Sequence, residues 1–173
     1  MLSTLCESLL QLIGYRGIDF TKALSEFICK EQFLLENDIN ERTLTHKLAE
    51  YLQKYFPDYN VDCEYNRMMQ NEDYVKKTLK LPTEQTVEIS DITQRTVYPD
   101  IIIHRRGNNN NNLLVIEVKK SANRNNKDFD SWKLEAFTTQ LNYRLGLYLE
   151  FNENGISDFA LYQKGKKIGA SND

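Results

Sequence analysis

The chain has 173 residues, of which 40% are hydrophobic and 27% charged, a composition typical of one globular domain with a core of its own. No apolar run approaches the length needed to cross a bilayer, and Ser3, Glu7 and Gln11 interrupt residues 2–13, which excludes a signal sequence there. Three widely spaced cysteines argue against a disulfide framework or a zinc site. We therefore expect a single domain over residues 1–173, without a membrane partner, in a reducing cytoplasmic setting.

The net charge of −3 conceals an asymmetry between the two halves of the chain. Residues 1–97 carry 11 Lys and Arg against 16 Asp and Glu, whereas residues 98–173 carry 11 against 9. The second half is thus the part suited to face a polyanion. The excess is too small to predict tight non-specific binding of nucleic acid by itself.

Apolar residues at helical spacing predict helices over residues 2–13 and 20–35, with the Gly-Tyr-Arg-Gly sequence at 14–17 as the break between them. We interpret these helices as an N-terminal extension, residues 1–36, that covers the core of residues 37–163. A role in oligomerisation is the alternative, and no residue singles it out.

The clearest helical pattern spans residues 39–56 and is ended by Pro57. On a helical wheel Glu41 falls in the middle of the apolar stripe, which consists of Leu44, Leu48, Leu52 and Tyr55. One interpretation is a capping box at the helix end, with Asp38 as the N-cap and Glu41 three residues later. The other is that Glu41 is an acid directed at a functional site.

Alternating residues over 60–65 predict a strand. Residues 67–97 are charged and irregular, with a strand-like stretch at 86–89, and we interpret them as an excursion from the core. Two apolar runs follow, residues 98–103 and 113–120, separated by a loop with one glycine and five consecutive asparagines. This pattern predicts a two-stranded antiparallel hairpin.

The hairpin carries three charged residues on one face. Side chains alternate along a strand, so Glu117 and Lys119 share a face. A turn centred between residues 108 and 110 places Asp100 opposite Glu117, Lys119 or the residue between them, and either odd-sum register brings all three side chains together. Charged groups in an otherwise apolar hairpin are costly, which makes this patch a candidate binding site.

A second amphipathic helix is predicted over residues 128–143, with Lys133 and Gln140 inside its apolar arc. Snorkelling of the two long side chains to the helix edge is one interpretation. The alternative is that they reach toward the charged patch. Strands are predicted at residues 145–151 and 159–162, and the basic stretch 164–167 is interpreted as a solvated tail. His104 is interpreted as a surface or substrate-edge residue.

A helix that carries Glu41, a Pro99-Asp100 pair that opens a strand, and a Glu117-Val118-Lys119 sequence on the next strand resemble the PD-(D/E)xK nuclease superfamily. The resemblance covers residues 39–151 apart from the excursion. It implies an α/β restriction-endonuclease-like core, in which a central mixed β-sheet is flanked by helices.

The resemblance also implies a chemistry, that of a Mg²⁺- or Mn²⁺-dependent nuclease. Asp100, Glu117 and the backbone carbonyl of Val118 would hold the metal, with Glu41 completing its shell, since Mg²⁺ takes hard oxygen ligands and keeps several waters. Lys119 would orient or help deprotonate the attacking water and offset phosphate charge. DNA is the expected substrate. Because the domain is small and has no separate recognition module, we expect a partner protein, a homodimer, or structure-guided rather than sequence-specific cleavage.

Other interpretations of the same residues stay open. Lys133 and Gln140 are candidate accessory residues; Gln140 and Tyr143 only approximate the Gln and Tyr that some relatives carry on this helix. A structural Glu117–Lys119 ion pair has the same sequence signature. The alternative functions are a ribonuclease on the same site and a catalytically silent nucleic-acid-binding or assembly module. The resemblance also suggests a role in bacterial defence or in a mobile element, but no residue of the sequence indicates such a role.

Overall fold

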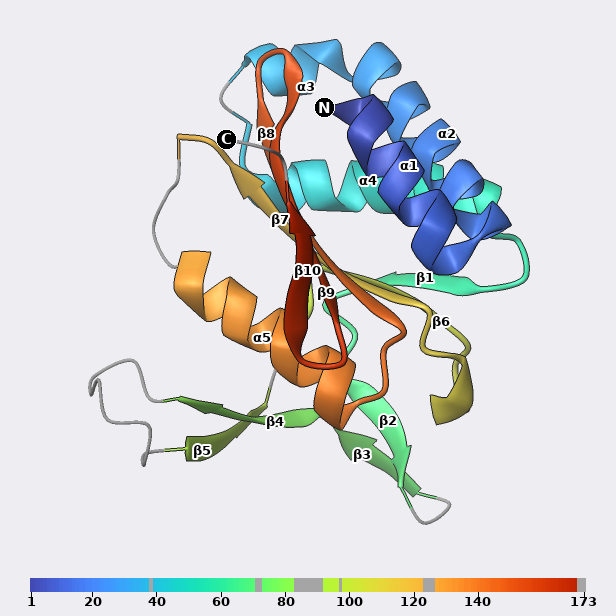
Figure 1. The fold of residues 1–173 in the computed structure, drawn as a ribbon, viewed down its shortest axis with the longest axis vertical. Coiled ribbons are helices and arrows are strands. Elements are labelled where there is room, and N and C mark those ends of the chain that lie inside the picture. The colour runs from blue at the N-terminus through green and yellow to red at the C-terminus, as the bar shows by residue number, and fades with distance from the viewer. Residues whose placement is uncertain (38, 71–72, 83–91, 97, 123–126, 171–173) are drawn as a thin grey trace.

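The computed structural model describes residues 1–173 except 38, 71–72, 83–91, 97, 123–126 and 171–173 (Figure 1). The helices are α1 (Leu2–Ile13), α2 (Tyr15–Lys30), α3 (Gln32–Glu36), α4 (Glu41–Tyr55) and α5 (Lys127–Gln140), with a short 3₁₀ turn at Asn109–Asn111. The strands are β1 (Asn60–Cys63), β2 (Arg67–Gln70), β3 (Asp73–Lys76), β4 (Thr78–Pro82), β5 (Ile92–Thr96), β6 (Ile101–His104), β7 (Leu114–Lys120), β8 (Leu145–Asn152), β9 (Gly155–Gln163) and β10 (Lys166–Ala170).

Six of the strands form one mixed sheet in the order β1-β6-β7-β8-β9-β10. Strands β7 and β8 run parallel and are joined through α5, whereas the other neighbours are antiparallel. Helices cover both faces of this sheet (Figure 1). The predicted fold class, α/β with a central mixed β-sheet flanked by helices, is confirmed.

The two faces of the sheet belong to two apolar clusters. Ile101 and Ile103 pack with the buried residues of α1 to α4, whereas Ile102 between them packs with Leu134 and Phe137 of α5. This is the alternation of a strand that is buried on both faces. The same alternation places Val118 on the α4 side and Glu117 on the α5 side, where it meets Lys133.

The N-terminal helices follow the prediction with two corrections, one of which is that the predicted helix over residues 20–35 is divided at Glu31 into α2 and α3. Helix α1 has the predicted bounds, but α2 begins at Tyr15 instead of residue 20, so the break between them is Gly14 alone, at φ 61°. Gly17 lies inside α2, where this helix contacts α1 closely. A Cβ atom at this position would lie 2.5 Å from the backbone carbonyl carbon of Leu9, which explains the glycine. The predicted loop glycine is thus a close contact between two helices. None of the helices in the described part of the chain combines the length and apolar character needed to cross a bilayer.

The segment between β1 and β6 is more regular than predicted. Its described residues form two antiparallel hairpins, β2–β3 and β4–β5, outside the central sheet. Leu79 and Leu81 of β4 are fully buried in the α5 cluster, so this part of the excursion covers α5 (Figure 1). The strand-like stretch at 86–89 lies outside the described residues.

The prediction of a solvated tail at residues 164–167 is confirmed for the lysine side chains, which are exposed, and wrong for the backbone, which forms a turn and the start of an edge strand. Lys164 and Gly165 both have positive φ, 50° and 75°, and connect β9 to β10 as a tight hairpin turn. Positive φ at both central residues is the geometry that matches the twist of antiparallel strands. The chain therefore continues the sheet by one edge strand.

Candidate active site

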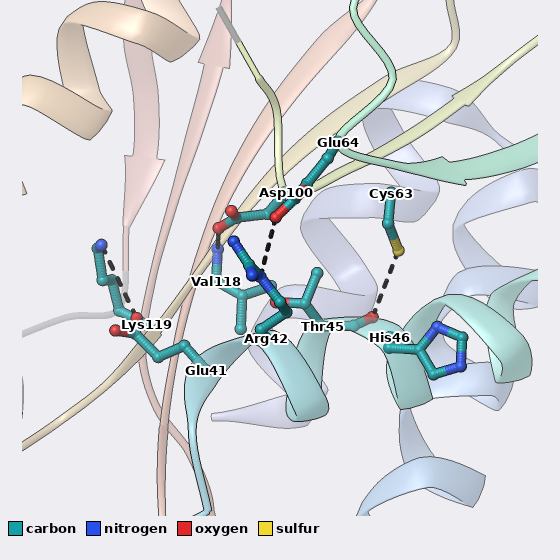
Figure 2. A pocket seen from close by; sticks show the side chains of 9 residues that line it. All are labelled: Glu41, Arg42, Thr45, His46, Cys63, Glu64, Asp100, Val118 and Lys119. Carbon is teal, nitrogen blue, oxygen red and sulfur yellow. Dashed lines mark hydrogen bonds and ion pairs between the residues drawn. The ribbon is translucent and has the colours of Figure 1, made fainter.

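The hairpin β6–β7 brings the first two predicted site residues together. Ile101 pairs with Ile116, so the register places Asp100, just before β6, opposite Glu117. This is one of the odd-sum registers that the turn position predicts. The backbone N–H of Val118 donates to Asp100 Oδ2 at 2.8 Å, which orients the carboxyl group at the end of the strand (Figure 2).

Glu117 is buried and pairs with a lysine from α5. Lys133 Nζ lies 2.6 Å from Glu117 Oε2 and 3.4 Å from the carbonyl oxygen of Tyr98. The snorkelling interpretation of Lys133 is therefore wrong, and the interpretation that it reaches the patch is correct. The apolar arc of α5 packs on the sheet directly over Glu117, so a lysine in that arc meets a carboxylate instead of solvent.

Gln140, the other polar residue in the arc, does not reach the patch. Its side-chain amide accepts from the backbone N–H of Lys80 at 3.0 Å and donates to the carbonyl oxygen of Lys80 at 3.1 Å. The Gln140 side chain therefore connects α5 to β4 by two hydrogen bonds. Tyr143 is also outside the patch, and its hydroxyl accepts from Lys77 Nζ at 2.7 Å.

Lys119 lies between two further acids. Its Nζ atom is 3.3 Å from Asp130 Oδ2 and 3.8 Å from Glu41 Oε2. Asp130, in the first turn of α5, was missed by sequence reasoning. A signal existed, because Asp130 is three residues before Lys133 on the same helix face, and the two side chains approach to 4.0 Å.

Glu41 is the first residue of α4 and points toward Lys119 (Figure 2). The helix is capped by Asn40, whose Oδ1 accepts from the backbone N–H of Thr43 at 2.8 Å. The predicted capping box is therefore wrong, because with Asn40 as N-cap Glu41 occupies the first helical position instead of the third. The proposed N-cap, Asp38, lies outside the described residues.

Burial is the main cause that raises the pKa of the two central acids, Glu117 and Asp100. Burial raises the pKa of Glu117 to about 8, with smaller contributions from Asp100 and Asp130, against the attraction of Lys133. Burial likewise raises the pKa of Asp100. Burial lowers the pKa of Lys119, but Asp130 and Glu41 outweigh it and leave that pKa above its ordinary value. Such crowded carboxyl groups accept a cation or keep a proton.

An open cavity of about 480 Å³ adjoins the patch (Figure 2). Its lining comes from the start of α4, the end of β1 and the hairpin, and comprises Glu41, Arg42, Thr45, His46, Cys63, Glu64, Asp100, Val118 and Lys119. Asp100 and Lys119 thus face a space that a substrate can enter. Arg42 and Glu64, paired at 3.1 Å, form part of its rim.

Whether a metal ion fits the site depends on the carboxylate oxygens that make no other hydrogen bond. In the part of the chain that is described, no three His, Cys, Asp or Glu side chains are arranged as a metal cluster. Mg²⁺ needs fewer protein ligands, because it retains waters. One oxygen of Asp100 is bonded to Val118 and one of Glu117 to Lys133, while Glu117 Oε1 is buried without a hydrogen-bond partner among the described residues. That remaining oxygen, beside Asp100, fits a hard cation held mainly by two carboxylates.

His104 does not belong to the site. It is buried at the opposite end of β6, with Nε2 2.8 Å from Asp62 Oδ2 and its ring 4.9 Å from that of Tyr65. The prediction of a surface or substrate-edge residue is wrong. Its partner Asp62 lies on β1, which pairs with β6 directly.

The chain was compared with protein-family models, with curated proteins and with solved structures. No family model, curated protein or solved structure matches it.

Proposed function

We propose that this protein is a metal-dependent nuclease that hydrolyses phosphodiester bonds, with DNA as its substrate. The observation that carries the proposal is the juxtaposition of Asp100 and Glu117 across the β6–β7 hairpin, with Lys119 beside them at an open cavity. The order of these residues along the chain, with Glu41 on the preceding helix, supports the resemblance to the PD-(D/E)xK nucleases. DNA is favoured by that resemblance alone.

The residues divide the work of hydrolysis among them. Asp100 and Glu117 would hold a Mg²⁺ or Mn²⁺ ion, with the carbonyl of Val118 and the carboxylate of Glu41 as supporting groups. Such an ion, when bound, neutralises phosphate charge and makes a water more acidic. Lys119 stays protonated at neutral pH because its pKa is raised, so its ammonium donates to a phosphate oxygen or to the attacking water.

A direct assay tests the proposal. Purified protein is incubated with circular and linear duplex DNA, single-stranded DNA and RNA, in the presence of Mg²⁺, Mn²⁺ or a chelator. We expect cleavage of DNA that the chelator abolishes. Cleavage of RNA alone would make the protein a ribonuclease, and binding without cleavage would make it a silent binding module. No cleavage and no binding of any nucleic acid would contradict the proposal.

Replacing Asp100 by asparagine is expected to weaken Mg²⁺ binding by more than about tenfold, because a carboxylate ligand loses its charge. The asparagine oxygen still accepts from the Val118 N–H, so the fold is retained. Isothermal titration with Mg²⁺ measures the change. Asp128→Asn, at an exposed acid of α5, is the matched control. Equal Mg²⁺ affinity in Asp100→Asn and the wild type would remove Asp100 from the proposed metal site.

Replacing Glu41 by glutamine is expected to lower the cleavage rate by about tenfold to a hundredfold, the range found for groups that support a metal site from nearby. The same substitution at Glu50, an exposed acid on the same helix, serves as the control. Initial rates on linear DNA measure both variants. Full activity in Glu41→Gln would reduce Glu41 to a structural partner of Lys119.

A further inference from the structure

The ammonium group of Lys133 lies among the carboxylates of the candidate site. It is 2.6 Å from Glu117 Oε2 and 4.0 Å from Asp130 Oδ1, and its charge also acts on Asp100. The side chain is buried, since the residue is only 8% exposed. The ammonium group of Lys133 therefore compensates part of the negative charge of these buried carboxylates, which would otherwise need a bound cation.

The charges of the patch can be balanced with a single ion. The four carboxylates of the patch are Glu41, Asp100, Glu117 and Asp130, and its two ammonium groups are Lys119 and Lys133. With every group ionised, the patch lacks two positive charges, which is the charge of one Mg²⁺. A second divalent ion would leave an excess of positive charge next to the buried ammonium group of Lys133.

The contacts of Glu117 also indicate a single metal ion. Two-metal sites hold their ions about 3.5–4 Å apart and need carboxylate oxygens for both. One oxygen of Glu117 is already taken by Lys133, and its Oε1 lacks a hydrogen-bond partner among the described residues. Asp130 Oδ2 also makes no hydrogen bond there, but it lies 3.3 Å from the ammonium group of Lys119. One oxygen of Asp100 is likewise taken by the Val118 N–H. Glu117 thus has one oxygen left for an ion, and one oxygen of Asp100 is already occupied.

We propose that Lys133 takes the place of a second metal ion, so that the site binds a single divalent cation. The inference rests on the proposed function, because it concerns the ion that the nuclease would use. It assigns to α5 a role in the chemistry of the site, in addition to covering the sheet. It also gives a reason for a lysine inside the apolar arc of that helix.

Counting bound Mn²⁺ ions tests the inference without any activity assay. The full chain is titrated with Mn²⁺ at about pH 8, and free Mn²⁺ is measured by electron paramagnetic resonance. We expect one bound ion in the wild type and two in Lys133→Met, which removes the charge but keeps the length of the side chain. Lys127→Met, at an exposed lysine of the same helix that pairs with Asp158, is expected to bind one ion. Lys133→Gln, also expected to bind two, replaces Lys133→Met if circular dichroism shows the latter to be unfolded.

The outcomes separate this inference from the function on which it rests. Two ions in the wild type, or one ion in folded Lys133→Met or Lys133→Gln, would overturn the role of Lys133 and leave a metal-dependent nuclease intact. Absence of Mn²⁺ binding in the wild type would overturn both. A second ion in Lys127→Met would also overturn the inference, because any loss of positive charge would then have the same effect.

Discussion

Cleavage by the Lys119→Ala variant is expected to fall by about a hundredfold to ten-thousandfold, the contribution typical of a positioned acid–base group. Lys119 is the ammonium at the cavity, and no other lysine lines that space among the described residues. Its loss removes the donor to the phosphate or the attacking water. Initial cleavage rates at saturating Mg²⁺ measure the effect.

The same variant is expected to keep its melting temperature within a few degrees of the wild type. The Lys119 side chain is 22% exposed, and its contacts to Asp130 and Glu41 are 3.3 and 3.8 Å long, so solvent screens them in part. We expect a loss of about 1 kcal/mol or less. Lys120→Ala, which removes a donor to the Ile39 carbonyl oxygen from the next residue of β7, is the matched control. If Lys119→Ala unfolds at room temperature, the result supports the alternative that Lys119 belongs to a structural ion pair, and the catalytic role of Lys119 is lost.

The Glu117→Gln variant is expected to be inactive and, above neutral pH, more stable than the wild type without divalent ions. The pKa of Glu117 is raised from 4.5 to about 8 by burial. Between these two values the folded state holds a proton that the unfolded state releases, so the free energy of unfolding falls as pH rises. Glutamine has no such proton and resembles the protonated acid. The two proteins should therefore be equally stable near pH 5, where Glu117 is protonated in the folded state.

Urea unfolding at about pH 5 and about pH 9 measures this difference. At the higher pH we expect the variant to be more stable by a few kcal/mol, on the order of one for each pH unit between the two pKa values. Mg²⁺ should stabilise the wild type and leave the variant unchanged, because bound metal favours the ionised carboxylate. Glu153→Gln, an exposed acid in the β8–β9 turn, controls for the general effect of charge. Equal pH dependence in Glu117→Gln and the wild type would show that Glu117 ionises freely in the fold.

The sequence was sufficient to predict the central hairpin and to limit its register to three alternatives, of which the structure has the one that places Asp100 opposite Glu117. Two apolar runs around a polar loop define antiparallel strands, and the period of two then decides which side chains share a face. Asp100, Glu117 and Lys119 follow from these two local rules. The helix that carries Glu41 follows in the same way from its apolar stripe.

Other features depended on contacts between distant segments. Lys133 has the same sequence pattern whether it snorkels to solvent or meets a carboxylate, and only the packing of α5 on β7 distinguishes the two. The basic stretch after β9 turns back and begins the strand β10 because the edge of β9 offers hydrogen bonds. His104 has a buried polar partner because β1 brings Asp62 beside it.

Local periodicity therefore determined α1, α4, α5, five of the six strands of the central sheet and the identity of its central acids and lysine, because side-chain direction along a strand or helix is a property of the backbone. The spacing of three residues puts Asp130 and Lys133 on one face of α5, but only the tertiary structure decided that this face meets the central acids. Their charges come from a helix that begins seven residues after the hairpin ends. The partner of a buried charge is set by the sheet against which its helix packs, and no pattern within the helix specifies that partner.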